Sequence, residues 1–100
     1  MPRYPLLHGN SKMHESRVVT DILSAIETAA AANDVRQVEA ARIEIGALSH
    51  VTTEGFAGHF SLVSEGTVAD GIRLNITKSD DRDAPDALDV RLVSIVAGDQ

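Results

Sequence analysis

An apolar stripe at helical spacing is the feature that most limits how this chain can fold. Over residues 16–32 the apolar side chains recur three or four positions apart, as they do on one face of a helix. They are Val18, Val19, Ile22, Leu23, Ile26, Ala29 and Ala30. Ser16 and Glu15 suit the positive end of a helix dipole and place its start near Ser16. A helix with one apolar face must bury that face, so a second layer is expected.

Alternating apolar and polar residues then predict three strands. Residues 38–46 and 72–77 show the two-residue period of a strand, and residues 88–96 supply apolar groups to both faces of a third strand. Residues 79–87 are rich in aspartate and contain Pro85. This composition predicts a solvated, flexible loop between the last two strands.

A second helix is predicted between the first two strands, over residues 53–65. Thr52 or Thr53 can cap its start, and Phe56 and Phe60 lie one turn apart on one face. Two glycines in the same segment weaken its helix propensity. Burial of the two phenylalanine rings must therefore compensate.

The order helix, strand, helix, strand, strand predicts an α/β fold of the two-layer α+β type. Its two helices would pack on one face of a small three-stranded mixed sheet, with a right-handed crossover between the first two strands. Residues 1–12 hold Pro2, Pro5 and Gly9 without periodicity and predict an N-terminal arm. Residues 13–100 are expected to form a single domain.

Composition excludes several classes of function. None of the 100 residues is cysteine, so no structural zinc site built on thiolates is expected. The net charge of −6, without a basic run, argues against nucleic acid and anionic membranes as partners. No apolar run approaches the roughly 20 residues of a membrane span, so a cytoplasmic protein is expected. Motifs for nucleophilic, phosphate-binding and metalloprotease sites are missing, which predicts that the protein is not an enzyme.

Four histidines are the candidate metal ligands, because imidazole suits nickel, copper and zinc. His8 falls in the predicted arm and His59 near the middle of the second helix, where a solvated side chain is the simpler interpretation. His50 lies in the turn before that helix, where capping or solvation competes with ligation. His14 stands just before the first helix, and its position alone does not mark it as a ligand.

A short motif, Met13-His14-Glu15, gains weight from three segments further along the chain. These segments, residues 41–49, 65–71 and 91–95, come at characteristic spacing. In this order the chain resembles the HypA/HybF family of nickel metallochaperones for hydrogenase maturation. In that family Met-His-Glu is the amino terminus, and its amine, the next backbone nitrogen and the imidazole bind one nickel ion. A planar set of nitrogen donors suits Ni(II).

The resemblance implies a role for each residue of the motif. Met13 takes the terminal position, His14 the imidazole position and Glu15 the following acidic position. His50 is a candidate auxiliary ligand, because it could substitute for an acidic residue that the family often has where this chain has Thr52. Nickel would be bound transiently, and the implied partners are a maturation GTPase and the large-subunit precursor of a nickel–iron hydrogenase. The chain departs from the family where twelve residues precede Met13 and where the family inserts a zinc module. Residues 79–87 hold that place.

Three functions are consistent with these observations. The first is a nickel-binding accessory protein of hydrogenase maturation, with the site near His14. The second is a metal-free adaptor for the same partners, in which residues 1–12 block the nickel site. The third sets the resemblance aside and describes a small ligand-binding α/β domain that forms homo-oligomers through the strand edge at residues 88–96.

Overall fold

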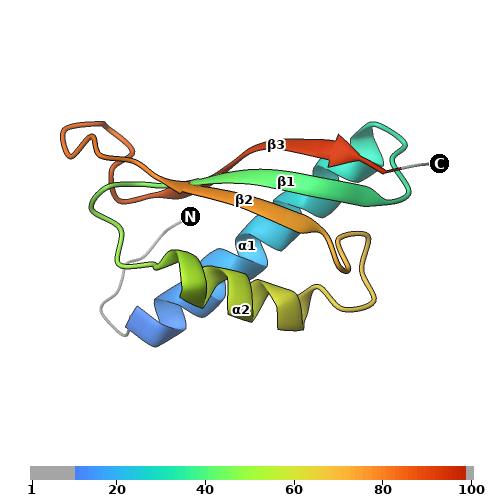
Figure 1. The fold of residues 1–100 in the computed structure, drawn as a ribbon, viewed down its shortest axis with the longest axis horizontal. Helices are drawn as coiled ribbons and strands as arrows, with labels where there is room; N and C mark the ends of the chain where they lie inside the picture. Colours follow the sequence, from blue (N-terminus) through green and yellow to red (C-terminus); the bar gives the residue numbers. More distant parts are fainter. Residues whose placement is uncertain (1–10, 99–100) are drawn as a thin grey trace, which may run out of the picture.

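The computed structural model describes the backbone of residues 11–98 and the side chains of residues 15–98. It contains five elements, in the predicted order (Figure 1): α1 (Ser11–Ala32), β1 (Val38–Ile45), α2 (Thr53–Val63), β2 (Arg73–Lys78) and β3 (Val90–Ala97). Within the described residues, no helix combines the length and the apolar character needed to cross a membrane.

The first helix begins at Ser11 rather than near Ser16. Glu15 and Ser16 therefore lie inside α1, and the prediction that they form its N-terminal end is wrong. The helix continues beyond the apolar stripe because residues 11–15 contain neither proline nor glycine to stop it. Residues 1–10, the greater part of the predicted arm, lie outside the described residues.

The sheet is mixed, as predicted, and β1 is its central strand. The strand order is β2-β1-β3, with β2 parallel and β3 antiparallel to β1. Ile43 in the middle of β1 faces Ile76 of β2 and Leu92 of β3. Both helices cover the same face of this sheet, which confirms the predicted two-layer fold (Figure 1).

The core lies between the helices and the covered face of the sheet. It joins the predicted stripe of α1 to the inward side chains of β1 and α2. Its most deeply buried large side chains are Val19, Ile26, Val38, Ile43, Ile45, Val51, Phe56 and Phe60. The rings of Phe56 and Phe60 stack with their centroids 5.9 Å apart. This stacking provides the compensation expected for the glycines of α2.

Thr52 caps the start of α2. Its backbone is extended, and its Oγ1 accepts a hydrogen bond from the backbone nitrogen of Gly55 at 3.0 Å. One of the two predicted caps is thereby confirmed. At its other end α2 stops at Val63, earlier than predicted, and Gly66 comes three residues later with a positive φ of 79° that favours glycine.

Replacing Thr52 by alanine should lower the free energy of unfolding by about 1 kcal/mol, because one of the first N–H groups of α2 loses its acceptor. Thr53→Ala is the matched control, since the Thr53 hydroxyl bonds the Glu54 carboxylate and caps nothing. Its effect should stay below about 0.5 kcal/mol. Urea denaturation measures both variants, and equal losses would contradict the assignment of the cap.

Candidate functional site

The first turns of α1 lie beside the first turn of α2 (Figure 1). The closest approach joins Glu15 to Gly55. A Cβ atom built on Gly55 would lie 2.5 Å from Oε2 of Glu15 and 2.8 Å from Oγ1 of Thr52. The half-buried Glu15 carboxylate therefore occupies the space that glycine leaves open. Glu15, the last residue of the motif, thus lies against the start of α2.

Met13 and His14 contribute helical backbone to this site. The side chains of both residues lie outside those that the structure describes, so their part in metal binding stays a prediction. In the chain of 100 residues the Met13 nitrogen belongs to a peptide bond within α1. A peptide nitrogen must give up its amide proton before it can bind a metal ion. A neutral amine already has a lone pair that can bind the metal.

The turn between β1 and α2 presents His50. Its neighbours Ser49 and Val51 are both buried, and Val51 donates its backbone N–H to Oγ of Ser49 at 3.2 Å. The ammonium group of Lys78 donates to the Ser49 carbonyl at 3.3 Å. His50 itself is exposed. Its imidazole therefore faces solvent from a turn that is held on both sides.

The segment between β2 and β3 is a loop, as predicted, and hydrogen bonds tie both of its ends to the end of β1. The backbone nitrogen of Ser79 donates to the Ile45 carbonyl at 2.9 Å. The nitrogen of Gly46 donates to the Asp89 carbonyl at 2.7 Å. Successive turns precede β3, which consequently starts at Val90 and not at the predicted residue 88.

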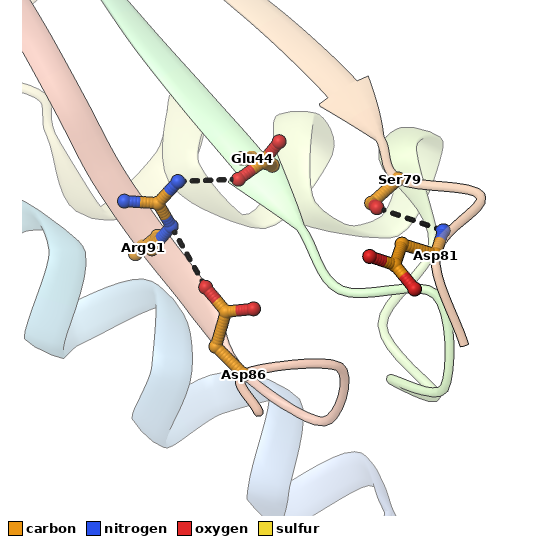
Figure 2. A network of polar contacts seen from close by, with 5 residues as sticks. All are labelled: Glu44, Ser79, Asp81, Asp86 and Arg91. Carbon is orange, nitrogen blue, oxygen red and sulfur yellow. Dashed lines mark hydrogen bonds and ion pairs between the residues drawn. The ribbon is translucent and has the colours of Figure 1, made fainter. Parts of the chain in front are cut away.

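Figure 2 shows two of the loop aspartates with their polar partners. Asp86 Oδ2 lies 3.2 Å from Nε of Arg91, whose Nη2 lies 2.6 Å from Oε1 of Glu44. The backbone nitrogen of Asp81 donates to Oγ of Ser79 at 3.1 Å. The hydrogen bond from Arg91 to Glu44 raises the pKa of the Arg91 guanidinium, which stays charged. These exposed pairs fix the course of the loop more than they add to stability.

Among the side chains that the structure describes, no three histidine, cysteine, aspartate or glutamate residues gather as a metal site would require. The exposed His50 and the half-buried His59 stand on the turn and on α2 without such a group around them. His8 and His14 fall outside this comparison.

A shallow cavity of about 390 Å³ lies beside the later turns of α2. Phe60, Ile72 and Leu74 line it, with the carboxylates of Glu65 and Asp70 also in its wall. Its residues begin at Ala57, after the turn that contacts Glu15. The cavity is therefore separate from the site around the Met-His-Glu motif.

Fold and site together define a small two-layer domain with a histidine-bearing first helix. Solved structures share this architecture. The solution structure of the Ni metallochaperone HypA from Helicobacter pylori superposes with a TM-score of 0.70 at 20% identity, covering 83% of this chain and 96% of that one. A second solution structure, of a HypA protein, gives 0.64 at 24% identity, covering 89% and 98%. At this identity the likeness shows the fold.

Comparison of sequences supplies the family. The sequence model described as "Hydrogenase/urease nickel incorporation, metallochaperone, hypA" matches residues 13–82, more than half of the chain. The protein therefore belongs to the HypA family, and the predicted resemblance is confirmed. The match begins at Met13, the first residue of the motif.

Curated relatives agree with this assignment. The hydrogenase maturation factor HypA of Methylocella silvestris is 33% identical over 64 residues, covering 64% of this chain and 57% of the relative. The factor of the same name from Salmonella typhimurium is 37% identical over 68 residues, covering 68% and 58%. The chain thus spans less than two thirds of the length of these relatives.

Sequence reasoning did not find the contact between Glu15 and Gly55. The two residues stand on different helices, and only their packing brings them together. A glycine in the first turn of a predicted helix, where most residues have a higher propensity, was the available signal.

Proposed function

We propose that this protein carries nickel for the maturation of a nickel–iron hydrogenase. The family match that begins at Met13 is the observation that supports this most directly. It puts the Met-His-Glu motif at the head of the matched region, and relatives over this region are named hydrogenase maturation factors. The protein would act as a carrier in the cytoplasm, without catalysing a reaction.

Nickel would be held near His14. The imidazole of His14 and the nitrogen of Met13 are the proposed donors, with Glu15 next in the motif and His50 as an auxiliary ligand. Nitrogen donors of this kind suit Ni(II). The His50 imidazole is exposed and therefore accessible to a metal ion. Few donors at an open site favour transient binding, as a carrier requires.

The proposed partners would be a maturation GTPase and the large-subunit precursor of the hydrogenase. A carrier must release its metal to a partner with more donors or a better geometry. An open site near the surface permits such transfer by ligand exchange. No structural zinc is part of this proposal, because the chain has no cysteine.

Replacing His14 by alanine should weaken Ni(II) binding about tenfold or more, because loss of an imidazole donor costs at least as much as loss of its supporting shell. Isothermal titration with Ni(II) measures the affinity of the 100-residue chain and of the variant. His59→Ala is the matched control, since it removes a histidine from α2 away from the proposed site. Equal affinities for His14→Ala and the unchanged protein would remove His14 from the site.

A further inference from the structure

We propose that Glu15 and Gly55 form a latch that holds the helical backbone of Met13 and His14 against the start of α2. Glu15 is then a positioning residue that acts through its contact with α2. The contact itself is independent of metal, whereas its consequence for nickel rests on the proposed function.

The geometry of the latch is specific to one glycine of α2. A Cβ on Gly55 would approach both Oε2 of Glu15, at 2.5 Å, and its Cδ, at 3.3 Å. Real Cβ atoms essentially never come within 3.0 Å of another atom, so any larger residue would displace the carboxylate. Gly58, on the same helix, has nothing within 4 Å of the same position. Only the first turn of α2 is therefore shaped to receive Glu15.

Position and charge both favour Glu15 at this point. It stands on the face of α1 that carries Val19 and Ile22, one and two helical turns further on, so it continues the buried stripe toward the start of the helix. Its carboxylate lies at the N-terminal end of α2, where the helix dipole favours negative charge.

The latch accounts for a glycine that local propensity disfavours. Glycine in a helix is less stable than alanine, yet Gly55 leaves the room that the Glu15 carboxylate occupies at the start of α2. Through this contact the backbone of Met13 and His14, directly before Glu15 in α1, is held near the start of α2. A nickel ion would then meet the Met13 and His14 donors on a helix end that is already held in place.

Hydrogen exchange in the metal-free chain of 100 residues tests the contact. In the first turns of α1 the amides of residues 15–18 donate to carbonyls four residues earlier, so they report whether this end of the helix opens. In Gly55→Ala they should exchange about tenfold faster, because the displaced carboxylate no longer ties α1 to α2. Glu15→Ala should give the same increase. At residues 15–18 the double variant should exchange no faster than Glu15→Ala, since the added methyl group then meets only Thr52 Oγ1, at the start of α2 itself.

Two controls separate the latch from general effects on α2. Gly58→Ala adds the same methyl group to the same helix and should leave exchange of residues 15–18 unchanged. Thr52→Ala removes the cap of α2 but not the carboxylate, and should speed exchange only at the start of α2. Gly55→Ala behaving like Gly58→Ala, or the double variant adding a further increase, would overturn the latch.

Titration with Ni(II) tests the consequence for the metal. Gly55→Ala keeps every proposed donor, so a latch that positions them predicts about tenfold weaker binding than in Gly58→Ala. A Gly55→Ala protein with faster amide exchange at residues 15–18 but unchanged nickel affinity would overturn the positioning role of Glu15. Should the unchanged protein bind no nickel, the proposed function fails, while the exchange rates still decide whether the latch exists.

Discussion

Replacing Gly46 by alanine is expected to lower the free energy of unfolding by about 3 kcal/mol, because the new methyl group would overlap backbone atoms that cannot move away. A Cβ at Gly46 would lie 2.7 Å from the Asp86 carbonyl oxygen and still closer to the carbonyl group of Ala87. The Ala87 carbonyl also accepts a hydrogen bond from the Leu48 nitrogen at 2.7 Å. Moving this carbonyl away from the methyl group would break that bond, which ties the loop to the turn after β1. Urea denaturation followed by circular dichroism measures the loss.

Gly58→Ala is the matched comparison for this experiment. It has open space around the added methyl group and lies inside α2, so it should raise the free energy of unfolding by up to about 1 kcal/mol. The two substitutions are chemically identical and should differ in sign. A Gly46→Ala protein within about 0.5 kcal/mol of the unchanged one would show that the loop shifts without cost.

A protein that starts at Met13 is expected to bind Ni(II) roughly 100-fold more tightly than the 100-residue chain, because its terminal amine would be a ligand. Losing a group that only supports a metal ligand already lowers affinity by up to about 100-fold. In the shorter protein the Met13 nitrogen is a free amine, whose ordinary pKa near 8 leaves a basic donor once nickel displaces its proton. In the longer chain the same atom is a peptide nitrogen inside α1. Titration with Ni(II) at one fixed pH compares the two.

Acetylation of the shorter protein provides the control. It removes the charge and the lone pair of the terminal amine while keeping Met13, His14 and Glu15 in place. The acetylated protein should bind nickel no better than the 100-residue chain. Equal affinity of the free and acetylated forms would exclude the amine as a ligand, and the metal-free adaptor would then describe the protein better.

Periodicity in the sequence predicted most of the fold. The apolar stripe of α1 and the alternation in β1 mark the two layers that face each other in the core, and the Thr52 cap arises from local hydrogen bonding. The start of α1 at Ser11 was missed because residues 11–15 carry no apolar pattern, and a helix can run on wherever nothing stops it. Element ends are decided by tertiary contacts as much as by local sequence.

The site was predicted less completely than the fold. The Met13-His14-Glu15 motif and the family came from order and spacing along the chain, and the family is confirmed. The contact of Glu15 with Gly55 depends on how two helices cross, which no local pattern encodes. The same is true of Gly46, whose need for glycine arises from a loop that lies far along the sequence.

The loop after β2 has a consequence for how this family can vary. Its two ends, at Ser79 and Asp89, are bound to the neighbouring residues Ile45 and Gly46, so the chain leaves and rejoins the domain at almost one point. A longer loop at this point would add little to the entropy cost of loop closure, since that cost grows only with the logarithm of loop length. The length of this loop can therefore change while every strand keeps its neighbours in the sheet.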